Sequence, residues 1–165
     1  MSYRILGLDP GTATTGFACI DTHHHTIEVI DIGYISTQKH LTLAERLHEL
    51  ANDIENIINT VVPDAVSIEK IFFAKNVKTG ISVAHARGVL LYCSQKSSIE
   101  VFEYSPNEIK TVITGDGHAD KLQIQKMVKL WCGLATLPKT DDAADALATA
   151  LCHAIKKETA IPTKL

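Results

Sequence analysis

The sequence predicts an α/β fold, in which helices flank one five-stranded mixed sheet. Near the start, three segments of strand length follow one another too closely for helical crossovers, which indicates an antiparallel meander. From residue 41 onward, segments with the helical period alternate with short apolar runs, and no repeat or linker interrupts them. Such an order is typical of a single sheet with helices around it.

The first half of the chain supplies the meander and one helix. The strands are expected at residues 4–8, 16–21 and 26–36. A helix follows between residue 41 and Pro63, because apolar side chains recur there every three or four positions. Its expected buried stripe consists of Leu43, Leu47, Leu50, Ile54, Ile57 and Ile58.

The second half supplies two more strands and four helices. The strands are expected at residues 65–68, just before Glu69, and 99–104, with a helix between them that ends near Gln95. Pro106 suits the first turn of the next helix, with Ser105 as its N-cap. The last two helices are expected at residues 120–130 and from Thr140 or Asp141 onward, where Leu147, Leu151 and Ala154 form the buried stripe.

Length and composition are those of a globular domain. The chain has 165 residues, of which 45% are hydrophobic and 21% charged. We expect one domain over residues 1–157 and a polar tail over 158–165. No apolar run is long enough for a membrane span, so no membrane partner is expected. The scattered cysteines read as buried, reduced thiols, which favours a cytoplasmic protein.

Charge is distributed unevenly along the chain. Residues 1–64 carry three Lys or Arg and nine Asp or Glu, whereas residues 65–165 carry thirteen and ten. The stretch from Lys70 to Ser98 contains five cations and no acid. A basic face of this kind suffices for phosphate contacts, although a solvated helix would also explain it.

Four carboxylates are placed so that one fold can bring them together. Asp9 and Glu69 each end a short apolar run, and Asp142 and Asp145 share a face of an alanine-rich helix. Converging acids of this kind hold Mg²⁺, and paired ions can clamp a phosphodiester for attack by water. The residues therefore indicate a metal-dependent nuclease. Helical geometry alone leaves Asp141 open as the partner of Asp145.

Two adjacent aromatic residues follow Glu69 directly. Phe72 and Phe73 precede a cationic stretch with Lys75, Asn76 and Lys78. An aromatic ring beside an acidic site and flanked by lysines suits stacking on a DNA base. Strand alternation would turn one of the two rings toward the core.

The quoted residues resemble the RuvC family of Holliday junction resolvases over roughly residues 3–155. The resemblance is carried by residues 8–12 with Gly16, and by residues 68–76, 86–88, 101–104 and 142–148. It implies a ribonuclease H-like fold and a homodimer that makes paired, symmetric, metal-dependent nicks in a four-way DNA junction. It also implies the branch-migration proteins RuvA and RuvB as partners.

The resemblance also implies roles for individual residues. Asp9, Glu69, Asp142 and Asp145 match the metal ligands, which are expected to hold two Mg²⁺ per site, with Mn²⁺ as a substitute. Lys110 and Lys121 match catalytic lysines near the scissile phosphate, and Phe72 matches the stacking aromatic. Further DNA contacts are expected from Phe73, Lys75, Asn76, Lys78 and Arg87. The acids of the loop 115–120 depart from the pattern expected between the two lysines.

Two alternatives are open. A YqgF-type nuclease shares the fold and a similar first motif, but it is shorter and is not expected to contain the stretch 69–76. The segment Asp9-Pro10-Gly11-Thr12 also suggests an actin-like sugar kinase or ATPase. Such proteins need a duplicated fold and a second phosphate loop, and the sequence contains no second segment of this type.

Overall fold

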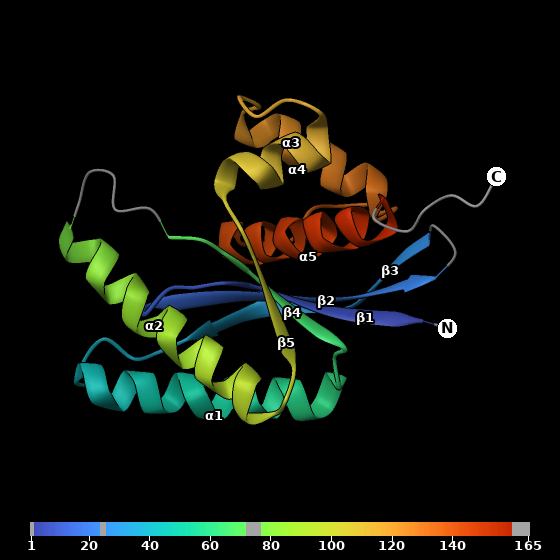
Figure 1. The fold of residues 1–165 in the computed structure, drawn as a ribbon. Coiled ribbons are helices and arrows are strands. Elements are labelled where there is room, and N and C mark those ends of the chain that lie inside the picture. Colours follow the sequence, from blue (N-terminus) through green and yellow to red (C-terminus); the bar gives the residue numbers. More distant parts are fainter. Residues whose placement is uncertain (1, 24–25, 72–76, 160–165) are drawn as a thin grey trace.

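The structure, a computed structural model, describes residues 2–23, 26–71 and 77–159, and it confirms the α/β architecture (Figure 1). The strands are β1 (Tyr3–Asp9), β2 (Thr14–His23), β3 (Thr26–Ser36), β4 (Ala65–Glu69) and β5 (Glu100–Tyr104). The helices are α1 (Leu43–Val61), α2 (Val77–Lys96), α3 (Pro106–Thr114), α4 (Lys121–Trp131) and α5 (Asp141–Thr159). Every strand and helix predicted from the sequence is present, with bounds that differ by a few residues.

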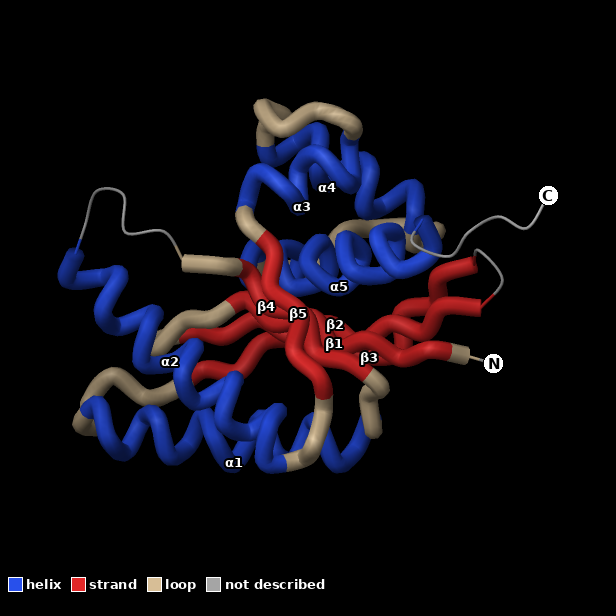
Figure 2. Tube along the Cα trace, viewed as in Figure 1, coloured by secondary structure: helices blue, strands red, loops and turns tan. Residues whose placement is uncertain are grey.

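The strands form one mixed sheet in the order β3-β2-β1-β4-β5. The predicted meander is confirmed, because β2 pairs antiparallel with both β1 and β3. The other two strands run parallel, β4 beside β1 and β5 beside β4. Figure 2 shows the strands as one layer between two layers of helices. The C-terminal ends of β1, β4 and β5 therefore meet at one edge of the sheet.

Each face of the sheet has its own core. α5, with α3 and α4 beyond it, covers one face, and α1 and α2 cover the other (Figure 1). β1 alternates between the two cores: Ile5 belongs to the α5 side, and Leu6 and Leu8 belong to the α1 side. Gly7 lies against α5. By the same alternation, Asp9 faces the α5 side.

In the part of the chain that the structure describes, three helices begin with a capping box. The pairs are Thr42 and Glu45 for α1, Ser105 and Glu108 for α3, and Asp120 and Gln123 for α4. The predicted cap at Ser105 and the proline in the first turn of α3 are thereby confirmed.

The burial predicted for Leu43, the first residue of the stripe on α1, is wrong. Leu43 is 42% exposed, because it is the first residue of α1, where the helix has only begun to cover the sheet. Leu50, Ile54 and Ile58 are buried as predicted, and Leu47 and Ile57 are half-buried. On α5, the predicted stripe of Leu147, Leu151 and Ala154 is buried.

The four cysteines are free and buried, as predicted (Cys19, Cys93, Cys132 and Cys152). No helix in the described part of the chain combines the length and apolar character that a bilayer crossing requires.

Candidate metal centre

Two of the predicted carboxylates lie at the ends of neighbouring strands. Asp9 is the last residue of β1 and Glu69 the last residue of β4. The strands are parallel, and Leu8 pairs with Ile68. Asp9 and Glu69, the next residue on each strand, therefore lie side by side. Ser67 donates a hydrogen bond to a backbone oxygen of α5, which places alternate residues of β4 on the α5 face. Glu69 therefore faces the same side as Asp9.

The other two carboxylates arrive on the first turns of α5, which lies unusually close to the sheet. A Cβ atom added to Gly16 would lie 1.9 Å from the backbone oxygen of Asp142. At Gly7 it would lie 2.2 Å from the backbone oxygen of Ala146. Only glycine permits this approach, and the alanines of α5 leave the backbone free to make it. Short aspartate side chains on α5 thereby reach the end of β1.

The site gathers like charges in partly buried surroundings. Burial is the main cause that raises the pKa of Asp9 to about 8. The charges of Asp145, Glu69 and Asp142 raise this pKa further, in decreasing order, and Lys121 acts in the opposite direction. All three other predicted ligands are thus near enough to Asp9 to destabilise its ionised form.

Glu69 and Asp145 behave in the same way. Burial is the first cause that raises the pKa of each carboxyl. Asp145 adds to the rise at Glu69, where Lys110 opposes it, and Lys121 opposes the rise at Asp145. The acidic cluster is therefore only partly compensated by the two lysines.

The predicted lysines lie beside this cluster. Lys121 Nζ is 3.1 Å from Asp141 Oδ2 and 3.5 Å from Asp145 Oδ2. Together with Lys110, Glu69 and Asp145, Lys121 lines a pocket of about 220 Å³. A second pocket, of about 250 Å³, lies against Asp9 and shares Glu69 and Pro106 with the first. The carboxylates therefore border open space on both sides, and the lysines border one of these spaces.

The donor set fits a hard divalent cation. The carboxylates offer only oxygen ligands, which suit Mg²⁺ and Mn²⁺. Within residues 2–23, 26–71 and 77–159, no group of three or more His, Cys, Asp or Glu side chains is arranged to hold an ion as it stands. Asp145 instead contacts Lys121, so the side chains would have to rotate toward a common centre. The raised pKa values support this fit, because a cation would stabilise the ionised carboxylates.

The structure distinguishes Asp141 from Asp142, which helical geometry left open. The Asp141 side chain is 74% exposed and pairs with Lys121. Asp142 is half-buried, and its charge acts on Asp9. This arrangement favours Asp142 and Asp145 as the pair that faces the strand ends.

The remaining predicted DNA contacts are described only in part. Phe72, Phe73, Lys75 and Asn76 lie outside the described residues, and the side chain of Lys78 is not described either. Arg87 lies on α2, where its guanidinium pairs with Glu103 of β5. These contacts stay predictions.

Sequence reasoning missed the hydrogen bonds that fix the turn after Asp9. The Thr12 hydroxyl donates to the backbone oxygen of Ser82 on α2 at 2.6 Å. The backbone oxygen of Thr12 accepts from the Thr37 hydroxyl and from Arg46, at 2.6 and 3.0 Å. Polar residues near a turn are so common in sequences that they do not reveal such a network. In the structure, the burial of the Thr12 side chain is the sign of it.

The acids of the loop 115–120 have local structural tasks. Asp116 Oδ1 accepts a hydrogen bond from the backbone amide of His118 at 2.8 Å. Asp120 caps α4, whose first residue is Lys121. Their presence in the loop thus has an explanation that involves no phosphate.

The chain is similar to known proteins over most of its length. The family model described as Crossover junction endodeoxyribonuclease RuvC matches residues 5–153. A protein of that name from Chloroflexus aggregans is 45% identical over 151 residues, which cover 92% of each chain. One from Caldicellulosiruptor saccharolyticus is 44% identical over 159 residues, or 96% of each chain.

Solved structures give the same result. Thermus thermophilus RuvC superposes with a TM-score of 0.89 at 26% identity, covering 94% of this chain and 96% of that one. The same protein in complex with a Holliday junction substrate gives a TM-score of 0.90, also at 26% identity, over 95% and 96% of the two chains. The fold is therefore that of RuvC, and this chain belongs to the RuvC family of crossover junction endodeoxyribonucleases.

Proposed function

We propose that this chain is a divalent-metal-dependent endonuclease that resolves Holliday junctions by paired, symmetric nicks during recombination and repair. One observation carries the proposal: carboxylates from β1, β4 and α5 gather at one edge of the sheet, and they raise one another's pKa. Membership of the RuvC family and likeness to a RuvC structure with a junction substrate support it. Neither a YqgF-type nuclease nor an actin-like kinase has comparable support.

The residues of the site have separable tasks in phosphodiester hydrolysis. Asp9, Glu69, Asp142 and Asp145 would hold the metal, which when bound orients the scissile phosphate and lowers the pKa of an attacking water. The water loses a proton as its oxygen bonds to phosphorus, the bond from phosphorus to one ester oxygen breaks, and that oxygen takes up a proton and leaves as a hydroxyl. Lys110 and Lys121 border the pocket beside the ligands, where they offset negative charge that develops on the phosphate.

The number and kind of metal ions are part of the proposal. Four carboxylates are enough to share two Mg²⁺, and Mn²⁺ takes similar oxygen ligands. Two ions would stabilise the attacking and the leaving oxygen together. Metal dependence itself is general in this family.

We also infer a homodimer, and the outward face of α2 supports it. Ile81 is 49% exposed and Tyr92 63% exposed, and both lie on the helix face that contains Gly88. A Cβ atom at Gly88 would meet nothing within 4 Å, so a second helix can approach closely there. A dimer places two sites on one junction, which paired nicks require. RuvA and RuvB as partners and a cytoplasmic location stay predictions from the resemblance.

The proposal is tested with a synthetic four-way junction and a linear duplex of the same sequence. We expect Mg²⁺-dependent paired nicks in the junction and none in the duplex. Asp9→Asn, Glu69→Gln, Asp142→Asn and Asp145→Asn should each abolish cleavage and leave junction binding largely intact, because affinity comes from cations that meet phosphates. Near-normal cleavage by two or more of these variants would contradict the metal site, and equal cleavage of the duplex would contradict junction selectivity.

A further inference from the structure

An aromatic side chain lies in the same cross-strand row as the catalytic Asp9. In the register of the meander, Asp9 pairs with Gly16, and Gly16 pairs with Tyr34 on β3. Adjacent strands lie about 4.8 Å apart, so two steps place the Cα atoms of Asp9 and Tyr34 about 10 Å from one another. Tyr34 is therefore a near neighbour of the site, on the side away from β4.

The row also fixes the face on which Tyr34 lies. A Cβ atom at Gly16 would point at the backbone of Asp142, so side chains of this row point toward α5. In agreement, Tyr34 lines a pocket together with Thr140, just before α5, and Ala143 in its first turn. The first turn of α5 thus has the carboxylates on one side and Tyr34 on the other.

The pocket beside Tyr34 has room for a nucleotide base. Its volume is about 380 Å³, within the range of small-molecule sites. Apolar side chains form most of its wall, including Ile32 of β3 and Leu137 and Pro138 of the segment before α5. Tyr34 is 53% exposed, so the tyrosine is available as a stacking surface.

One cation borders this pocket. Lys139 lines it and is exposed, and the described part of the chain shows no ion pair for this lysine. Asp141 and Asp142 follow close by, and a phosphate near them requires a compensating charge. Lys139 supplies that charge on the Tyr34 side, as Lys121 does on the opposite side of the α5 start.

We propose that Tyr34, Leu137, Pro138 and Lys139 form a nucleotide subsite for the strand that is cut. The base of a nucleotide near the scissile phosphate stacks on Tyr34 inside the apolar pocket, and Lys139 contacts its phosphate. Phosphates of one B-form strand advance about 3.4 Å per nucleotide along the axis, so about 10 Å corresponds to roughly three nucleotides or fewer. The inference rests on the proposed nuclease function and adds a position at which the DNA strand is held.

An abasic scan tests this subsite. Junctions carry one abasic nucleotide at successive positions within about five nucleotides of the cut, and kcat/KM is measured for each. For the unaltered protein, we expect one position within about three nucleotides of the cut where kcat/KM falls about tenfold, because base stacking on an aromatic side chain is lost. On the intact junction, Tyr34→Ala should lower kcat/KM about tenfold, mainly by raising KM. An abasic nucleotide at the sensitive position should then lower kcat/KM of this variant no further.

Further variants separate stacking from other effects. Tyr34→Phe should show the same dependence of kcat/KM on abasic position as the unaltered protein. Tyr34→Leu should behave like Tyr34→Ala, and it replaces the alanine variant if that variant does not fold. Ile30→Ala is the matched control, because Ile30 is an exposed apolar residue of the same strand that does not line the pocket. Lys139→Ala should raise KM at every abasic position alike.

The outcomes are distinguishable. The subsite is wrong, and the nuclease proposal stands, if Tyr34→Ala and Tyr34→Leu cut the intact junction like the unaltered protein. The same holds if kcat/KM of these variants still falls at the abasic position where that of the unaltered protein falls. If the unaltered protein cuts no junction with Mg²⁺, both proposals are wrong.

Discussion

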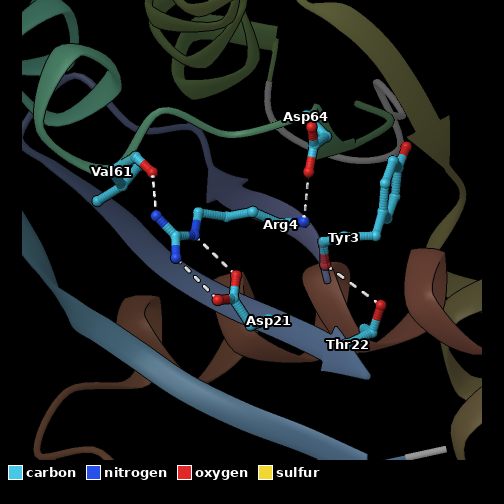
Figure 3. A network of polar contacts seen from close by, with 6 residues as sticks. All are labelled: Tyr3, Arg4, Asp21, Thr22, Val61 and Asp64. Carbon is cyan, nitrogen blue, oxygen red and sulfur yellow. Dashed lines mark hydrogen bonds and ion pairs between the residues drawn. The ribbon is translucent and has the colours of Figure 1, made fainter. Parts of the chain in front are cut away.

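The paired strands β1 and β2 carry an aspartate near each end, and the surroundings shift the pKa of the two carboxyls in opposite directions. At one end, Asp21 receives two hydrogen bonds from the guanidinium of Arg4, at 2.7 and 2.8 Å (Figure 3). These bonds are the main cause that lowers the pKa of Asp21. At the other end, Asp9 has carboxylates as neighbours, and burial together with their charge raises its pKa to about 8.

The difference separates an acid held in a structural ion pair from one that we propose as a metal ligand. Arg4 also donates to the backbone oxygen of Val61, at 2.7 Å, so the ion pair with Asp21 ties the strand pair to the end of α1. The charge of Asp21 is thus already compensated by a cation of the protein itself. The cluster around Asp9 raises the pKa of its carboxyls, and a cation would stabilise their ionised forms, as we propose for a metal site.

The largest expected effect is on cleavage. Asp9→Asn should lower the rate of junction cleavage by at least about 10³-fold, because metal ligation is lost. Asp21→Asn is the matched control, since it makes the same chemical change at the other end of the strand pair. Below its melting temperature, it should cut within about twofold of the unaltered rate. Equal losses in single-turnover assays would mean that the two ends do not differ in function.

The next largest effect is expected at Lys121. Lys121→Ala should slow cleavage by about 10²-fold, because a cation that offsets developing charge is removed. Lys129→Ala is the control, because it removes an exposed lysine near the other end of the same helix and should leave the rate unchanged. If the two variants cut at the same rate in single-turnover assays, Lys121 only compensates the charge of the folded protein.

The end of the strand pair that contains the Arg4–Asp21 ion pair should affect stability and not cleavage. Asp21→Asn should lower the free energy of unfolding by about 2 kcal/mol, because a partly buried guanidinium loses its charged partner. Urea denaturation measures this value. Asp31→Asn serves as the control, because Asp31 is an exposed acid of the neighbouring strand β3. A loss no larger than that of the control would show that the Arg4 network contributes little.

A buried histidine tests how the Tyr3 end of the sheet responds to acid. His153 lies 2.7 Å from Tyr104 Oη through Nδ1, and burial is the main cause that lowers its pKa to about 4. The unfolded chain, with an ordinary histidine pKa near 6.5, binds this proton more readily, so stability falls as the pH drops from about 6.5 toward 4. Between pH 7 and pH 5 we expect the protonation of His153 to contribute a loss of about 1–2 kcal/mol, taken as the difference between the curves of the unaltered protein and of His153→Gln, because the raised pKa of Asp9 acts in the opposite direction. This loss should be absent from the curve of His153→Gln, and parallel curves would contradict the assignment.

The sequence contained enough information for the strands, the helices and the placement of Asp9 and Glu69 at the ends of two strands. Period and turn residues locate the elements, and the ends of β1 and β4 follow from two apolar runs that each stop at an acid. It did not reveal why α5 lies so close to the sheet. Gly7 and Gly16 permit that approach, but a sequence does not say which backbone will lie against a glycine.

Charge partners were also out of reach of sequence reasoning. Arg4 and Asp21 are separated by sixteen residues, and only the antiparallel register brings them opposite one another. The choice between Asp141 and Asp142 depends on how α5 is rotated over the strand ends, which helical spacing alone cannot give. The pocket beside Tyr34 depends in the same way on which segment covers β3.

Thermal unfolding with and without Mg²⁺ tests most directly whether the Asp9 end is a cation site. In the presence of a chelator at pH 7.5, Asp9→Asn should melt above the unaltered protein, because the cost of burying an ionisable carboxyl beside other acids is removed, and Asp21→Asn should melt below it. Adding about 10 mM Mg²⁺ should raise the Tm of the unaltered protein and of Asp21→Asn by a few degrees, as expected for millimolar affinity. Asp9→Asn should show little or no shift. A Tm of Asp9→Asn below that of the unaltered protein in chelator, or an undiminished Mg²⁺ shift in this variant, would contradict the account.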